Sequence, residues 1–504
     1  MSGFVERLSD REFWTRKPPA WAVTVIQQAA KDWLLVVLLI GAALYLPFLD
    51  VRPLRFEEGR RALQALEMLH GGAWWHLKVL GESYINKPPF TPWLISSIAF
   101  LQGAVDEIAV RLPGVLFALI GSLAAGAAAS SLVITDRKVA GLVGGLAFLC
   151  SVQLLLKTRV GETDVTVTAL CGLAFAIWIR ARTQGSLKLL HWASIAACFA
   201  CAALSKGPIP IAFPAIPMIA IPLLQRRYGQ AVAALAAITA AHLPMGLWVW
   251  DNLSASNAEH WAVELRVASN EAAPSIDWTK LLHLNDFPLA LLYLMPFLPA
   301  AAAMAFARAE LPRERRWPVD ALLLYAVPMT LLTTILPMGK ARYAMPAVWP
   351  VAVLAGMWVS MKWRQLYFAS FIVGAGLVAA IIVQVVQIGF LDGRTSGQRA
   401  FRGHAEQLSI ALAGLPPGPV PVIWTSRDFN YNLLAYAGRR LYLIQRSELG
   451  CRTGGDYLVV GRSDRGTVDA DGGWREIEPL SDWGAIYRRA ASAPVGDCAP
   501  AFRP

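Results

Sequence analysis

Long apolar runs alternate with short basic loops along most of the chain. Windows long enough to cross about 30 Å of hydrocarbon predict eleven membrane-spanning helices. Several of them contain Pro and Gly, which a membrane helix tolerates when its neighbours satisfy the freed backbone groups. The pattern therefore predicts a polytopic α-helical membrane protein. The expected spans are residues 33–49, 112–134, 139–156, 164–179, 189–204, 208–224, 231–250, 286–306, 320–337, 344–361 and 366–389.

Lysine and arginine in the loops indicate the orientation of these spans. If the amphipathic segment 1–32 is cytoplasmic, every basic cluster falls on the inside, and an odd number of spans puts the C-terminus outside. The sequence thus predicts a multi-pass inner-membrane protein whose C-terminal domain lies outside the cytoplasm. The inner clusters are Arg137–Lys138, Arg180 to Lys188, Arg226–Arg227, Arg308 to Arg316 and Lys362 to Arg364; the outer segments are 50–111, 157–163, 205–207, 251–285, 338–343 and the tail after about 390.

Two polar regions stand out: the first periplasmic loop, within the transmembrane domain expected over residues 33–390, and the tail that follows this domain. The first periplasmic loop, 51–111, contains an amphipathic helix near Glu57–Leu69, expected to lie on the membrane, and a short interfacial helix near Phe90–Leu101. After Leu391 short β-branched runs appear at 420–424, 441–444 and 457–460, with a helical stretch at 429–437. These features predict a small α/β domain over residues 391–504.

Composition supports the membrane assignment. The 504 residues are 56% hydrophobic and 16% charged, with a mean hydropathy of +0.45, which is more apolar surface than one soluble core can hide. The net charge of +11 comes from short clusters between apolar runs, so it does not indicate a nucleic-acid partner. The first thirty residues lack the pattern of a signal peptide, so the first span is expected to remain as an anchor.

The six cysteines divide into two sets. Cys150, Cys171, Cys198 and Cys201 lie in apolar runs and are expected to behave as small hydrophobes. The other two, Cys451 and Cys498, lie in a polar region. In an oxidising compartment they could form a disulfide, or they could remain free thiols.

The segment Phe56–Arg61 is the first candidate for chemistry. Its adjacent carboxylates, Glu57 and Glu58, precede Arg60 and Arg61, so the segment could supply a general base and a clamp for phosphate oxygens. A solvated loop with local ion pairs is the simpler explanation of these six residues taken alone.

Other outer segments place ionisable groups beside apolar helices. Lys87 precedes a Pro–Pro pair and could bind a phosphate or extend to lipid head groups. Asp164 begins a span, where it could cap the helix or act at a functional site. Lys206, Lys340 and Arg342 lie in short outer turns, against the positive-inside bias, which indicates an anionic ligand. The loop with Asp251, Glu259, His260, Trp261, Glu264 and Arg266 could line the same cavity.

Taken in order, these segments resemble the GT-C class of membrane glycosyltransferases, and most closely the branch of lipid A 4-amino-4-deoxy-L-arabinose transferases and protein O-mannosyltransferases. The resemblance covers roughly the first 350 residues. It departs from the family pattern at Glu57, where Asp is usual, and at Arg61 and Asn86, where Tyr and Glu are usual. The matching motifs are Glu57-Glu58-Gly59-Arg60 through Glu67-Met68, Tyr84 with Lys87-Pro88, Arg111-Leu112, Asp164, Lys206-Gly207-Pro208 and Lys340 to Pro346.

The resemblance implies transfer of a sugar from a polyprenyl-phosphate donor to a periplasmic lipid, glycan or protein acceptor. It implies Glu57 as general base or acceptor-orienting acid and Asp164 as a second carboxylate. The resemblance identifies no certain cofactor and leaves metal dependence open: the two carboxylates could bind a divalent cation, or the basic residues could take its place. The implied substrate contacts are Glu58, Arg60, Tyr84, Lys87, Arg111, Lys206, Lys340, Arg342 and Tyr343.

Two other classes fit a polytopic chain with charged outer loops. A transporter or flippase for lipid-linked sugars is expected to show internal repeats and sites near the bilayer midplane, whereas here the charged motifs cluster at outer helix ends and no repeat is visible. A non-catalytic subunit of envelope assembly would use the same charges to bind lipid head groups. The sequence does not identify the sugar, the acceptor or the oligomeric state.

Overall fold

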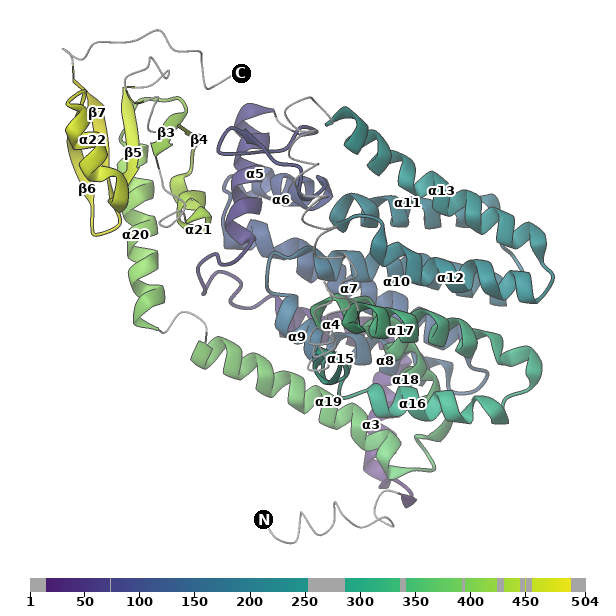
Figure 1. Ribbon diagram of the computed structural model, residues 1–504. Helices are drawn as coiled ribbons and strands as arrows, with labels where there is room; N and C mark the ends of the chain where they lie inside the picture. Colours follow the sequence, from purple (N-terminus) through teal and green to yellow (C-terminus); the bar gives the residue numbers. More distant parts are fainter. Residues whose placement is uncertain are drawn as a thin grey trace. The chain divides into compact units, whose positions relative to one another are not determined.

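The computed structural model describes residues 15–72, 74–252, 286–335, 341–391, 395–423, 430–444, 449 and 456–490. The chain divides into two compact units (Figure 1). Residues 1–47 and 114–386 form the first, here called the helical unit. Residues 48–113 and 387–504 form the second, the mixed unit. The segment before the second predicted span therefore shares a unit with the C-terminal tail.

The helical unit is built from helices that follow one another along the chain. They are α3 Ala20–Lys31, α4 Trp33–Tyr45, α7 Glu107–Leu132, α8 Arg137–Leu149, α9 Val152–Lys157, α10 Thr163–Thr183, α11 Leu189–Lys206, α12 Ile209–Leu224, α13 Tyr228–Asp251, α15 Asp286–Tyr293, α16 Leu298–Ala307, η2 Arg308–Glu310, η3 Arg313–Arg315, α17 Trp317–Ile335, η4 Ala341–Ala347, α18 Val348–Lys362 and α19 Tyr367–Val386. Helix α7 begins in the mixed unit, whose first segment ends at Pro113.

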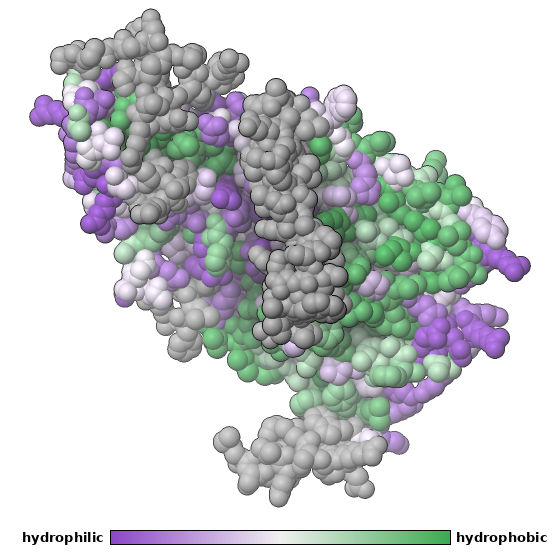
Figure 2. Space-filling view, in the orientation of Figure 1, coloured by the Kyte–Doolittle hydropathy of each residue, from purple (hydrophilic) through white to green (hydrophobic). Residues whose placement is uncertain are grey.

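Among the described residues, six helices are long and apolar enough to cross a membrane, or up to eight if each bent pair is one span. Helices α4 and α8 have 13 residues each. At about 1.5 Å per residue such helices are shorter than the hydrocarbon thickness. The chain is a helical membrane protein, and the exact number of eleven spans is not confirmed. Figure 2 shows the broad hydrophobic surface of the helices.

Small residues allow the helices to approach closely. A Cβ atom on Gly356 of α18 would lie 2.8 Å from the carbonyl oxygen of Ala140 on α8, and one on Gly172 would lie 2.2 Å from the ring of Trp349. Lipid gives no hydrophobic drive for helix association, so this close van der Waals packing is a main source of stability.

The mixed unit combines helices with a five-stranded sheet in the order β4-β3-β5-β7-β6. Strands β4, β3 and β5 are parallel, and β5, β7 and β6 are antiparallel. Its elements are α5 Glu58–Gly71, β1 Lys78–Val79, β2 Glu82–Ser83, α6 Phe90–Gln102, η5 Gln387–Leu391, α20 Ser396–Ala413, β3 Val420–Ile423, α21 Tyr431–Leu434, η6 Ala435–Ala437, β4 Leu441–Leu443, β5 Tyr457–Gly461, η8 Arg462–Asp464, α22 Arg465–Asp471, β6 Trp474–Leu480 and β7 Gly484–Arg489.

Helix α5 corrects one expectation. The sequence predicts that it lies on the membrane with a solvated polar face, but its polar residues Glu58, Arg61, Gln64 and Glu67 are all buried. Glu67, for example, accepts hydrogen bonds from the backbone N–H of Gly81 and from Arg440. The polar face is covered by protein, so α5 is a core helix of the mixed unit.

Candidate functional site

The predicted site residues fall into one group in each unit. In each group the structure brings some of the residues close together and gives others a structural role. Lys340 lies outside the described residues, as do Glu259, His260, Trp261, Glu264, Arg266, Cys451 and Cys498. The mixed unit contains Glu57, Glu58, Arg60, Tyr84, Lys87 and Arg111; the helical unit contains Asp164, Lys206, Arg342 and Tyr343.

Glu58 and Arg111 form a buried ion pair in the mixed unit. The Arg111 Nε and Nη2 atoms lie 2.8 and 3.0 Å from the two Glu58 oxygens. The guanidinium also donates to the carbonyls of Leu49, Arg52 and Pro53. All five N–H donors of Arg111 therefore have acceptors within the protein. Contact of these two residues with a substrate stays a prediction, and their geometry gives them a structural role.

Glu57, one residue earlier, is in a different environment. Its side chain is 44% exposed, and both of its oxygens lie 3.3 Å from Nη1 of Arg60, which is itself 35% exposed. Glu57 precedes the first turn of α5, where the helix dipole favours negative charge. The carboxylate is thus oriented by one arginine and open to solvent.

Residues from the C-terminal tail complete this group, and sequence reasoning missed them. The ring of Tyr431 lies 4.6 Å from the guanidinium carbon of Arg60. The Asn432 side chain accepts a hydrogen bond of 2.9 Å from the backbone N–H of Gly59. The sequence feature that could have pointed to these residues is Asn430, an N-cap residue immediately before a short helix. Nothing in the sequence linked that cap to a motif more than 370 residues away.

Tyr84 lies close enough to interact electrostatically with Glu57, Arg60 and Arg61, and burial raises its pKa. Burial alone would lower the pKa of Arg60, but Glu57, Tyr431 and Tyr84 together outweigh it, so that pKa is raised and Arg60 remains charged. Lys87 is half-buried further along the same segment. The structure thus brings Tyr84 to the Glu57–Arg60 pair.

In the helical unit, Asp164 and Lys206 form an ion pair. Asp164 lies in the first turn of α10, and Lys206 is the last residue of α11. Their side chains are 10% and 16% exposed. The ammonium of Lys206 also lies 4.9 Å from the ring centroid of Tyr343. Residues 42 and 137 positions from Lys206 in the sequence thus meet it in the structure.

Arg342 adds a further cation to this group. Its guanidinium carbon lies 5.3 Å from the Tyr343 ring, and its Nε is buried without a hydrogen-bond partner in the described part of the chain. Lys157 and Glu162, which the sequence left unassigned, form a neighbouring ion pair at 2.9 Å. Lys157, Lys206 and Arg342 thus gather with Asp164 and Glu162 in this site, here called the lysine–arginine site. A further carboxylate, Asp286, accepts a hydrogen bond from the backbone N–H of Ala341, next to Arg342.

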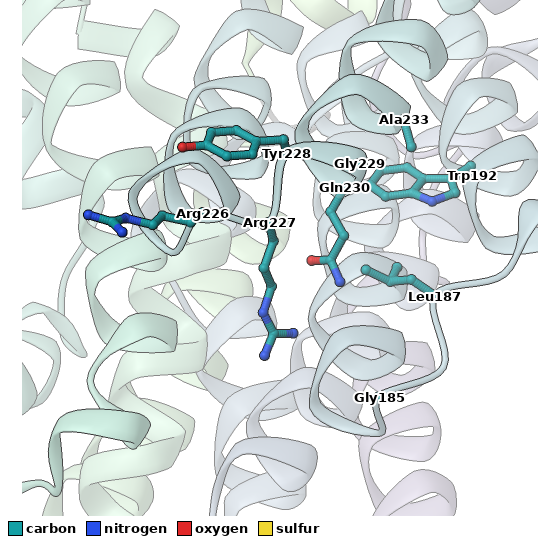
Figure 3. A pocket seen from close by; sticks show the side chains of 9 residues that line it. All are labelled: Gly185, Leu187, Trp192, Arg226, Arg227, Tyr228, Gly229, Gln230 and Ala233. Carbon is teal, nitrogen blue, oxygen red and sulfur yellow. The ribbon is translucent and has the colours of Figure 1, made fainter.

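The described residues contain no group of three or more His, Cys, Asp or Glu side chains that could hold a metal ion. One described cavity of about 710 Å³ lies between Trp192 and the turn Arg226–Gln230 (Figure 3). That cavity contains none of the predicted site residues.

Comparison with known proteins supports the resemblance seen in the motifs. Residues 86–250 match the family described as dolichyl-phosphate-mannose-protein mannosyltransferase. The chain is 26% identical over 362 residues to undecaprenyl phosphate-alpha-4-amino-4-deoxy-L-arabinose arabinosyl transferase 2 of Proteus mirabilis, covering 66% of this chain and 61% of that protein. A relative from Pectobacterium carotovorum is also 26% identical, over 71% and 65% of the two chains. The chain thus spans less than two thirds of the length of these relatives.

Solved structures show the same fold. ArnT from Cupriavidus metallidurans, bound to undecaprenyl phosphate, superposes with a TM-score of 0.64 at 15% identity, covering 92% of this chain and 98% of that one. The oligosaccharyltransferase of Archaeoglobus fulgidus gives a TM-score of 0.52 at 14% identity, with coverages of 90% and 73%. The chain therefore has the fold of these enzymes and resembles the arabinose transferase and protein mannosyltransferase branch of the GT-C glycosyltransferases.

Proposed function

We propose that this protein is a glycosyltransferase that moves a sugar from a polyprenyl-phosphate donor to a lipid, glycan or protein acceptor on the periplasmic side of a bacterial inner membrane. The observation that carries the proposal is the lysine–arginine site, where segments far apart in sequence bring Asp164, Lys206 and Arg342 together. The shared fold with a structure bound to undecaprenyl phosphate supports the donor class.

The lysine–arginine site can stabilise the phosphate leaving group. When the bond between the anomeric carbon and the phosphate oxygen breaks, the lipid phosphate gains negative charge, and cations already held in place stabilise it without reorganising. Lys206 and Arg342 supply that charge, and the unpaired Nε of Arg342 offers a donor. In this scheme Asp164 positions the Lys206 ammonium.

Glu57 can take up the proton that the acceptor loses. A new bond forms between an acceptor hydroxyl or amine and the anomeric carbon, and the acceptor proton must go to a base. Glu57 is exposed and is oriented through Arg60, whereas Glu58 is buried beneath it. We therefore assign the general-base role to Glu57, with inversion at the anomeric carbon as the class expectation.

The test is label transfer by the purified protein in nanodiscs. Radiolabelled polyprenyl-phosphate sugars and a membrane-lipid extract are supplied to wild type, Lys206→Met and Arg342→Gln. We expect each variant to lose transfer at least tenfold while binding of the acceptor extract is unchanged. Lys362→Met and Arg364→Gln, at the end of α18 and in the turn after it, serve as matched controls and should retain wild-type transfer.

The outcomes separate the competing classes. Product formed by wild type and lost in both site variants supports the enzyme. Absence of product with every donor, together with movement of a labelled lipid across proteoliposomes, would indicate a flippase. Neither product nor translocation would indicate an assembly subunit.

A further inference from the structure

A cavity lined by arginines lies at one end of the helical unit, away from the residues assigned above. It has a volume of about 580 Å³, and Arg137, Arg182, Arg227 and Arg315 line it, with Glu314 as the single carboxylate among its described lining residues. The arginines come from the start of α8, the end of α10, the turn between α12 and α13, and η3. We call it the arginine cavity.

Arg182 is the fixed member of this set. It is 7% exposed, and its Nη atoms donate to the side-chain oxygens of Gln225 and Gln230. Its guanidinium carbon lies 4.8 Å from the ring of Trp317 and 5.5 Å from that of Trp178. Neutral amides and aromatic rings orient the guanidinium but do not neutralise it, so its full charge remains at the cavity.

The other cavity arginines add to that charge. Among the residues that the structure describes, no ion pair joins any of the four to a carboxylate, and Glu314 offsets one charge at most. Nearby carboxylates are already engaged by other cations: Asp136 with Arg364, Glu310 with Lys362 and Asp320 with Arg308. A cluster of like charges is unfavourable unless an anion offsets it, and arginine suits phosphate oxygens because its planar donors bind them in pairs.

The surroundings of the cavity favour a lipid as the source of that anion. Ile134 lines the cavity and is 64% exposed, and Leu224 and Tyr228, on either side of the neighbouring turn, are 79% and 62% exposed. The cavity thus lies at the ends of apolar helices, where acyl chains can lie beside a bound head group. Basic pockets between membrane helices are a known mode of anionic head-group recognition.

We propose that the arginine cavity binds the phosphate head group of an anionic membrane lipid. Arg182, which is already held in place, contacts the phosphate, and Arg227 and Arg315 bind it from two other elements. By the predicted orientation this end faces the cytoplasm, so the site would be separate from donor and acceptor chemistry. The inference stands independently of the proposed reaction.

The chain provides a matched control within one turn. Arg226 and Arg227 are adjacent and both exposed, but Arg227 lines the arginine cavity and Arg226 does not. Figure 3 shows their side chains extending in different directions from the turn. Arg315, which lines the cavity, and Arg313, which does not, form a second pair.

Native mass spectrometry of the full-length protein in neutral detergent would test the proposal. Dioleoylphosphatidylglycerol is titrated against wild type, Arg227→Gln, Arg315→Gln, Arg226→Gln and Arg313→Gln, with phosphatidylcholine and inorganic phosphate as separate probes. We expect phosphatidylglycerol to bind in preference to phosphatidylcholine. Its affinity should fall about fivefold in Arg227→Gln and Arg315→Gln and remain unchanged in the two controls.

Three results would overturn the proposal. Equal losses in all four variants would mean nonspecific attraction of lipid to a basic surface. Inorganic phosphate that competes fully at the same concentration as the lipid would mean a soluble anion site. Equal binding of phosphatidylcholine would mean that the arginines do not select the head group. Unfolding curves confirm that the exposed-residue variants remain folded.

Discussion

Two glutamate–arginine pairs of the mixed unit are encoded by adjacent glutamates but differ in nearly every physical respect. Glu58 and Arg111 are buried, with side-chain exposures of 0% and 2%, and every donor of Arg111 is used within the protein. Glu57 and Arg60 are 44% and 35% exposed and are joined by longer contacts of 3.3 Å. The first pair is built into the fold, and the second is exposed and is the one to which we assign chemistry. Charge alone does not distinguish them; burial and hydrogen-bond partners do.

Replacing Glu57 should have the largest effect on activity. Glu57→Gln keeps the size of the side chain but removes the base, so we expect transfer to fall by about 10² to 10⁴. Because the side chain is exposed, Tm should stay within a few degrees of wild type. Initial rates and thermal unfolding, measured on the same preparation, check both. An active Glu57→Gln would refute the base assignment, and Glu82→Gln, an exposed glutamate of the same unit, is the control.

Replacing Glu58 should instead lower stability. Glu58→Gln leaves Arg111 with a buried, uncompensated charge, which costs about 3–5 kcal/mol. The double variant Glu58→Gln/Arg111→Met removes that charge and should recover part of the loss. Chemical denaturation in detergent measures the difference. A stable Glu58→Gln with reduced transfer would contradict the comparison, because it would place Glu58 in the reaction.

Gly59, which lies between Glu58 and Arg60 in the sequence, tests how tightly the C-terminal tail packs against the Glu57 motif. A Cβ atom there would lie 2.5 Å from the backbone N and Cα of Asn432, and backbone atoms cannot move aside cheaply. Gly59→Ala should therefore destabilise the mixed unit by about 1–3 kcal/mol and slow transfer by shifting Glu57. Gly466→Ala is the matched helical control, since nothing lies within 4 Å of that position.

Removing the Asn432 side chain should have the smallest effect. Asn432→Ala loses the hydrogen bond to the N–H of Gly59, worth about 1 kcal/mol, while Asn432→Asp can keep the acceptor. If the tail positions the Glu57 motif, Asn432→Ala lowers kcat with little change in KM for the donor. A loss of stability with unchanged kcat would limit Asn432 to a structural role.

Part of this structure could be predicted from local sequence patterns. The long spans near α7, α10, α11, α13 and α19 lie close to where apolar run length put them, because that length depends on bilayer thickness alone. Strands β3, β4 and β5 follow β-branched runs. The amphipathic α20 and the strands β6 and β7 were missed. Strand β6 is largely polar and exposed, and the buried run of β7, Gly484 to Tyr487, is too short to be recognised alone.

The sequence by itself determined that this is a helical membrane protein, and its ordered motifs indicated the glycosyltransferase resemblance. It also nominated Glu57, Asp164, Lys206 and Arg342, since ionisable groups beside apolar helices are costly and therefore informative. Only the tertiary structure showed that Glu58 is buried while Glu57 is exposed, paired Asp164 with Lys206, and brought Asn432 to Gly59. The physical reason is that burial and hydrogen-bond partners depend on residues hundreds of positions away, which no local pattern encodes.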